Sequence, residues 1–200
     1  MSFLIKNKIA RIVPEASFFL QCDVQTKFKD LIHKMPIIIK NTERMAKTAE
    51  ILKIPLVVTE QTPDKLGHTF DSIKEVYPKH TEYFEKTTFT MMTPEVKKYV
   101  EGLKRQTAVL YGIEAHVCVQ QTALDLCEQG YDVHLITDCV SSNSEHKRAT
   151  AIRRMIQAGV HLSTLESCIY EMMHSSEHEQ FRVMLKNVTK DSPSDNFSRV

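Results

Sequence analysis

Residues 107–126 read TAVLYGIEAHVCVQQTALDL, and this stretch decides how the rest of the chain is interpreted. Its first five residues form an apolar run without turn formers, which predicts a buried strand. Gly112 is expected to end that strand. From Val117 onward the apolar positions follow a helical period, which predicts a helix. Cys118 therefore stands where a helix begins after a strand.

The position of Cys118 has two interpretations. The first backbone N–H groups of a helix lack intrahelical partners and carry partial positive charge, so they would stabilise a thiolate. Because the thiolate is the reactive form of cysteine, Cys118 is a candidate nucleophile. The alternative is a small apolar residue packed at a helix start, since free cysteine is often a buried hydrophobe. This stretch by itself favours packing.

Strands and helices alternate through the rest of the chain. Amphipathic segments predict helices, and short apolar runs predict further strands at 17–22, 56–59, 131–137 and 160–162, while 83–89 is a short run of aromatic residues with a lysine inside it. This alternation predicts a parallel sheet covered by helices on both faces, in one domain spanning residues 1–200. Residues 62–80 show no sustained period and are expected to form a long loop whose two histidines are solvated. His134 is expected to be a packed strand residue, and Asp138 to follow that strand.

Composition excludes several classes of protein. The 200 residues are 42% hydrophobic and 26% charged, which is typical of a globular chain. The net charge of +1 gives no electrostatic argument for nucleic acid. No apolar run reaches the ~18 residues of a membrane span, so no membrane partner is expected. Five cysteines without CxxC spacing indicate a reducing compartment rather than a disulfide framework.

The two ends of the chain carry weaker signals. Lys6, Lys8 and Arg11 precede the first acid, Glu15, which faintly resembles a mitochondrial presequence, but a plain leading segment explains the pattern better, because no Ser/Arg-rich amphipathic stretch follows. The expected location is therefore cytoplasmic or mitochondrial. The polar tail at 188–200 is expected to be mobile or to dock on a partner subunit.

Two further residues stand near predicted strand ends. Asp23 directly follows the first predicted strand, and Lys86 lies among aromatic residues. Because active residues of open α/β sheets cluster at the carboxyl ends of strands, both are expected to meet Cys118 at one edge. Asp23 could accept the thiol proton, Lys86 could stabilise both anions, and the N–H groups of Val117 and Cys118 could form an oxyanion hole. Taken singly, Asp23 could equally be a turn-forming or capping aspartate, and Lys86 is better explained as a snorkelling lysine at a strand edge.

Three segments together resemble the isochorismatase-like cysteine hydrolases, in particular the isochorismatase-domain-containing proteins of animals and protists. These segments are FFLQCDVQTKF at 18–28, YFEKTTFT at 83–90 and YGIEAHVCVQQTALDL at 111–126. The resemblance covers nearly all of residues 8–187. It implies a Rossmann-like three-layer α/β/α sandwich with a mainly parallel, doubly wound sheet of about six strands.

The resemblance also implies the chemistry of the site. It assigns a catalytic triad of Asp23, Lys86 and Cys118, with a non-proline cis peptide bond at His116–Val117. It implies hydrolysis of a small amide-type C–N bond by a homo-oligomeric enzyme. Nicotinamidases of this superfamily bind a metal through an Asp-x-His…His pattern, which residues 60–68 lack, so no metal or other cofactor is expected.

The residues that flank the triad are candidates for a small-molecule pocket, although ordinary packing would explain them equally well. They are Gln25, Phe28, Gln61, Phe89 and His116. Two other functions compete with hydrolysis. One is a mitochondrial ribonuclease or RNA-associated protein, as some protist relatives are called. The other is a non-catalytic redox or scaffold protein on the same fold.

Overall fold

Six strands form one sheet at the centre of the structure, a computed structural model that describes residues 9–193. Every neighbouring pair is parallel, and the spatial order is β3-β2-β1-β4-β5-β6. The chain thus builds outward from β1 to one edge, returns to the centre at β4 and builds to the other edge. This is the doubly wound parallel sheet that was predicted. The strands are β1 (Ser17–Cys22), β2 (Leu56–Gln61), β3 (Glu82–Lys86), β4 (Thr107–Ile113), β5 (Asp132–Ser141) and β6 (His161–Ser163).

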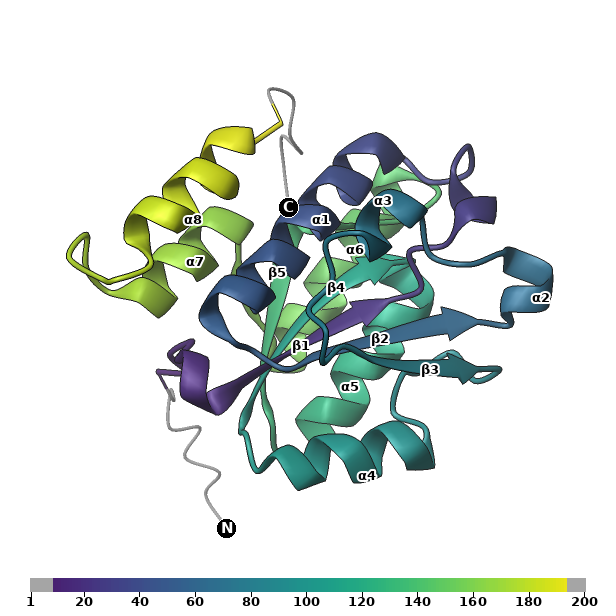
Figure 1. The fold of residues 1–200 in the computed structure, drawn as a ribbon. Coiled ribbons are helices and arrows are strands. Elements are labelled where there is room, and N and C mark those ends of the chain that lie inside the picture. The colour runs from purple at the N-terminus through teal and green to yellow at the C-terminus, as the bar shows by residue number, and fades with distance from the viewer. Residues whose placement is uncertain (1–8, 194–200) are drawn as a thin grey trace, which may run out of the picture.

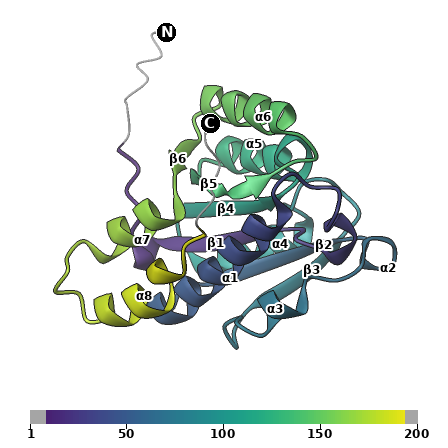
Figure 2. The ribbon, with the colours of Figure 1, turned by 90° about the horizontal axis from the view of Figure 1, so that it is seen from above.

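Helices cover both faces of the sheet, which gives the three layers that were expected (Figures 1 and 2). One face carries α1 (Met35–Leu52), α3 (Asp71–Lys74), α7 (Leu165–Met173) and α8 (Phe181–Asn187). The other face carries α4 (Pro94–Leu103), α5 (Gln120–Glu128) and α6 (Glu145–Gln157). The short α2 (Pro63–Leu66) lies beyond the carboxyl end of β2.

Local sequence signals explain where several helices begin. The Thr93 side chain accepts a hydrogen bond from the N–H of Val96, so it caps α4. The Ser144 side chain accepts from the N–H of Lys147 and caps α6 in the same way. Between β4 and α5 the backbone forms one turn of π-helix over Ala115–Val119, a form often found at functional sites.

The prediction that Gly112 ends the central strand is wrong, because β4 continues to Ile113. Gly112 has a φ of +119° and pairs with Cys22 of β1. A Cβ at this position would lie 2.1 Å from the Cys22 carbonyl oxygen, so only glycine fits there. The cis peptide bond lies at Ile113–Glu114, not at the predicted His116–Val117.

Asp138 is also placed differently from its prediction. It lies inside β5, which runs to Ser141, and its side chain accepts a hydrogen bond from the N–H of Leu165 at 2.8 Å. The carboxylate therefore ties β5 to the start of α7. His134 is packed in β5 as expected, with its ring stacked on His161 at a centroid distance of 5.1 Å.

The segment predicted as one long loop at 62–80 contains the two short helices α2 and α3. Glu60, at the end of β2, fixes this segment through both carboxylate oxygens. One accepts from the N–H of Thr69 at 2.7 Å, and the other lies 2.8 Å from Nδ1 of His68. His68 is largely solvated, as predicted, with 63% of its side chain exposed.

The ends of the chain are described only in part. Lys6 and Lys8 lie outside the described residues, as do residues 194–200. The segment expected to be a mobile tail begins packed, because Val188 is buried and its carbonyl oxygen accepts from Nε of Arg44 at 2.9 Å. Within residues 9–193, every helix is too short or too polar to cross a membrane.

Candidate active site

The sheet brings the three predicted triad residues to one edge. β1 and β4 are neighbours at the point where the strand order reverses, which is where ligands of open α/β sheets usually bind. Asp23 follows the last residue of β1, and Cys118 lies in the π-turn that follows β4. Lys86 is the last residue of β3, two strands away from β1. The side chain of Lys86 therefore has to extend past the end of β2.

Asp23 is the centre of this cluster. Its backbone has a φ of +49° and its side chain is buried. One carboxylate oxygen, Oδ2, accepts from Nζ of Lys86 at 2.6 Å, and the other, Oδ1, accepts from the hydroxyl of Thr59 at 2.8 Å. These contacts fix the plane of the carboxylate. Because both are made with side chains of other strands, the alternative of a simple turn-capping aspartate does not describe Asp23.

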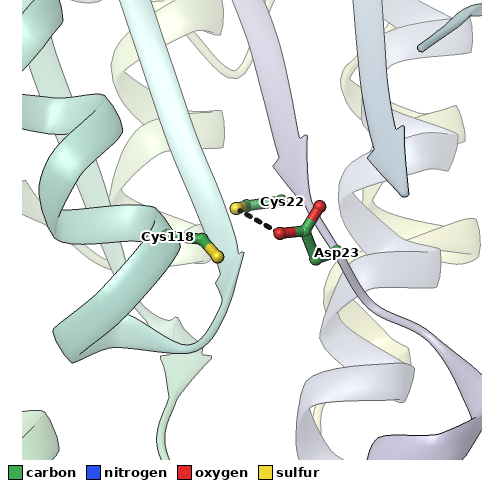
Figure 3. A group of neighbouring side chains, drawn as sticks. All are labelled: Cys22, Asp23 and Cys118. Atoms are coloured by element: carbon green, nitrogen blue, oxygen red, sulfur yellow. Dashed lines mark hydrogen bonds between the residues drawn. The ribbon is translucent and has the colours of Figure 1, made fainter. Parts of the chain in front are cut away.

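Cys118 faces Asp23 across the gap between the π-turn and the end of β1 (Figure 3). Its residue is 7% exposed, so its thiol is almost fully enclosed. Cys22 lies beside both residues, and its thiol donates to Oδ2 of Asp23 at 3.5 Å. The two sulfurs and a carboxylate oxygen of Asp23 all lie within 4.8 Å of one another. The cluster thus contains two thiols rather than one.

Lys86 is held by four acceptors, and its ammonium is buried. Besides Asp23, Nζ donates to Oε1 of Gln61 at 2.7 Å and to the carbonyl oxygens of Thr88 and Phe89 at 3.2 and 3.0 Å. The alternative of a snorkelling lysine at a strand edge is therefore wrong, because such a side chain keeps its charge in water. The charge is instead fixed against Asp23.

Burial shapes the protonation of this pair. Burial raises the pKa of Asp23 above that of an ordinary carboxyl, and the nearby charge of Lys86 opposes this rise without cancelling it. Hydrogen bonds from Thr59 and Cys118 oppose it further. Burial lowers the pKa of Lys86, but the neighbouring acidic groups of Cys22, Asp23 and Cys118 and the hydrogen bond to Asp23 outweigh this effect, so that its pKa is raised. Asp23 is therefore a stronger base than usual, beside a permanent cation.

Two of the candidate pocket residues serve mainly to build the site. Gln25 is buried, and its side-chain amide donates to the carbonyl oxygens of Gln61 and Gly67 and accepts from the N–H of Gln61. Gln61 in turn accepts from Lys86 and donates to the carbonyl oxygen of Thr87 at 3.0 Å. Their amides hold the loop after β2 against the lysine.

The other candidates lie farther out. Phe89 is 54% exposed, and Phe28 is partly buried against a small apolar cluster that includes Val24. His116 accepts or donates a hydrogen bond with the hydroxyl of Ser142 at 3.0 Å through Nδ1. A cavity of about 440 Å³ opens beside Lys86 and is lined by threonines and acids of the neighbouring loops, including Thr87 and Glu85.

One predicted oxyanion donor is already engaged. The N–H of Val117 donates to the carbonyl oxygen of Glu114 at 3.0 Å, so in this structure it points into the chain. The same carbonyl oxygen also accepts from the N–H of Val119 at 3.2 Å, which is an i to i−5 bond of the π-turn.

The cluster has the atoms for a metal site but an unfavourable charge. Two thiols and a carboxylate would suit a soft or borderline cation such as zinc. However, the Lys86 ammonium lies 2.6 Å from the same carboxylate and would repel that cation. The residues therefore fit an acid–base site better than a metal centre.

Sequence reasoning missed two members of the cluster, Thr59 and Cys22. Both carried a signal, since Thr59 ends the predicted second strand and Cys22 directly precedes Asp23. The parallel register that pairs Cys22 with Thr59 on one side and Gly112 on the other places both at the same edge.

Comparison with known proteins places this chain in a family. Residues 17–167 match the family described as "Isochorismatase domain". The chain is 38% identical over 193 residues to "Isochorismatase family protein 1B" of Dictyostelium discoideum, covering 94% of this chain and 93% of that protein. It is 37% identical over 189 residues to "Isochorismatase domain-containing protein 2A" of Mus musculus, covering 94% and 90%. The solved structure named "MAR1 Ribonuclease from Caenorhabditis elegans" superposes with a TM-score of 0.89 at 40% identity, covering 96% of this chain and 100% of that one.

Proposed function

The chain belongs to the isochorismatase family of hydrolases, and from this premise we propose that it is a cysteine hydrolase for a small amide-type substrate. Cys118 is the nucleophile, Asp23 the base and Lys86 the fixed cation. The observation that supports this proposal is the position of the Asp23 carboxylate. It bonds to the Lys86 ammonium at 2.6 Å and lies within 4.8 Å of the Cys118 sulfur.

Each residue has a defined role in the proposed reaction. Asp23 takes the thiol proton while the Cys118 sulfur attacks the carbonyl carbon of the substrate. The C–N bond breaks, the amine leaves with that proton, and a thioester to Cys118 remains. Asp23 then takes a proton from water, whose oxygen attacks the thioester carbon. The C–S bond breaks, the carboxylic acid leaves, and Asp23 returns the proton to the Cys118 sulfur, which restores the thiol. Lys86 stabilises the carboxylate whenever Asp23 is ionised.

The developing oxyanion needs a donor as well. Because Val117 is already bonded to Glu114, we assign this role to the N–H of Cys118 alone among the two predicted donors. The nearly enclosed thiol suits a small substrate, because little of its surface is open to a larger one.

A panel of small amides assayed with three proteins tests this proposal. Wild type and Cys127→Ala should turn over the same amides, because Cys127 is a half-buried cysteine of α5 outside the cluster. Cys118→Ala should lose turnover while keeping the same circular dichroism spectrum. Full activity of Cys118→Ala would refute the role of the thiol.

A ribonuclease is the competing function, because the similar Caenorhabditis elegans structure carries that name. The charge of this chain gives RNA little to bind, since the net charge is +1 and the buried cation of the site is already paired with Asp23. RNA retention measured over a salt series separates the two functions. Binding that falls steeply with salt, together with RNA cleavage retained in Cys118→Ala, would favour the ribonuclease.

A further inference from the structure

A second thiol lies beside the proposed nucleophile and takes no step in the proposed hydrolysis. Cys22 ends β1, and its sulfur, the sulfur of Cys118 and an oxygen of Asp23 lie within 4.8 Å of one another (Figure 3). Cys22 is 0% exposed, whereas Cys118 is 7% exposed. A small oxidant entering the site therefore meets Cys118 first and finds Cys22 next to it.

We propose that Cys22 is a resolving cysteine, which forms a reversible disulfide with Cys118 when a hydroperoxide oxidises the site. The two sulfurs lie within 4.8 Å of each other and have to approach to the S–S bond length of about 2 Å for this disulfide to form. The other described thiols are not members of this cluster: Cys139 lies in β5, Cys168 in α7 and Cys127 in α5.

The chemistry balances with the hydroperoxide as the oxidant. The Cys118 thiolate attacks the outer oxygen of the peroxide, the O–O bond breaks, and a sulfenic acid and an alcohol or water result. The Cys22 sulfur then attacks the Cys118 sulfur. The S–O bond breaks, and the hydroxyl leaves as water with the Cys22 proton. Two thiols have lost two electrons, and the peroxide has been reduced.

Asp23 gives this second step a base. The Cys22 thiol already donates to Oδ2 of Asp23 at 3.5 Å, so its proton has an acceptor as its sulfur attacks. Burial raises the pKa of Cys22 well above that of an ordinary thiol, and its hydrogen bond to Cys118 adds to the rise. Cys22 is therefore held as a thiol until Cys118 becomes electrophilic, which is the order that a resolving cysteine requires.

This pairing would switch the site off and protect it. A disulfide removes the Cys118 nucleophile, and it also prevents further oxidation of Cys118 to the irreversible sulfinic acid. The pairing requires the two thiols and the peroxide but no particular substrate. It can therefore fail or succeed independently of the proposed amide hydrolysis.

Peptide mass spectrometry after graded hydrogen peroxide tests the proposal. In wild type, we expect a peptide pair linked through Cys22 and Cys118 that dithiothreitol separates, together with loss of Cys118 alkylation by iodoacetamide. In Cys22→Ala, Cys118 should gain two oxygen atoms and remain unalkylated after dithiothreitol. Cys127→Ala should behave as wild type.

Two results would overturn the proposal. One is oxidised wild type in which Cys118 carries sulfinic acid without any link to Cys22. The other is Cys22→Ala that recovers Cys118 alkylation under dithiothreitol as fully as wild type. Because Cys22 is buried, Cys22→Ser is measured in parallel, since it keeps a donor to Asp23 and nearly the same volume. Thermal unfolding of both variants confirms that they are folded.

Discussion

At the scale of single residues, the site depends on a buried pair of opposite charges. The side chains of Lys86 and Asp23 are 0% and 2% exposed, with Nζ and Oδ2 2.6 Å apart. The sequence placed both near strand ends, and this much could be predicted from parallel topology alone. The four acceptors around Lys86 could not, since two of them are carbonyl oxygens set by the path of the loop after β3.

Replacing Lys86 by Met should destabilise the fold. The change leaves the Asp23 carboxylate buried without its countercharge, and breaking such a pair costs about 3–5 kcal/mol of unfolding free energy. Urea unfolding measures this loss, and Lys98→Met, at an exposed position of α4, is the control. The double variant Asp23→Asn with Lys86→Met should lose less than the sum of the single losses. Strict additivity would show that the pair is not coupled.

At the scale of secondary-structure elements, the approach of β1 and β4 determines where the site forms. Gly112 was predicted to break the strand because glycine commonly ends apolar runs. Its actual role depends on the neighbouring strand, whose Cys22 backbone lies against it, and no pattern within 107–126 reveals that contact.

Gly112→Ala should therefore lower the unfolding free energy by about 1–3 kcal/mol, because the added methyl group overlaps backbone atoms that cannot rotate away. Thermal and urea unfolding provide the measurement. Gly102→Ala is the matched control, since a Cβ there meets nothing within 4 Å, and replacing this helical glycine should stabilise α4 by about 0.5–1 kcal/mol. Equal stability of the two variants would contradict the close packing of β1 against β4.

The histidine pair on β5 and β6 predicts a loss of stability in acid. Burial, together with the neighbouring His161, lowers the pKa of His134 to about 4, while Glu171 and Asp132 act in the opposite direction. The unfolded chain takes up a proton at this histidine near pH 6.5, whereas the folded chain does so only near pH 4. Above about pH 6.5 His134 is neutral in both states, so its contribution to the unfolding free energy is complete there. It is lost as the pH falls from about 6.5 to about 4, and amounts to about 3 kcal/mol.

Urea unfolding of wild type and His134→Phe at pH 7 and pH 4.5 measures this effect. Wild type should lose more unfolding free energy between the two pH values than the variant does. An identical loss in both proteins would mean that His134 does not resist protonation in the fold.

At the scale of the whole molecule, the doubly wound sheet followed from the alternation of strands and helices, because parallel strands need helical crossovers. The assembly of several copies does not follow from that rule. β6 is an edge strand, and exposed large apolar side chains include Leu162 on β6, Ile156 on α6 before it and Tyr170 on α7 after it.

We therefore expect a homo-oligomer that buries this edge. Light scattering coupled to size exclusion should give a mass that is a multiple of 23.0 kDa. Leu162→Lys should reduce that mass. Leu31→Lys is the control: Leu31 is an exposed residue of the loop before α1, and its replacement should leave the mass unchanged. A wild-type mass of 23.0 kDa would contradict the expectation.

The central claim is that Cys118 is a nucleophile activated by Asp23 and Lys86. Its most direct test compares alkylation rates of the individual cysteines with iodoacetamide at pH 7, followed by peptide mass spectrometry. Cys118 should react first, ahead of Cys127, even though Cys118 is the more buried of the two. Faster labelling of Cys127, with Cys118 unmodified until the protein unfolds, would contradict the account and leave Cys118 as a packed thiol.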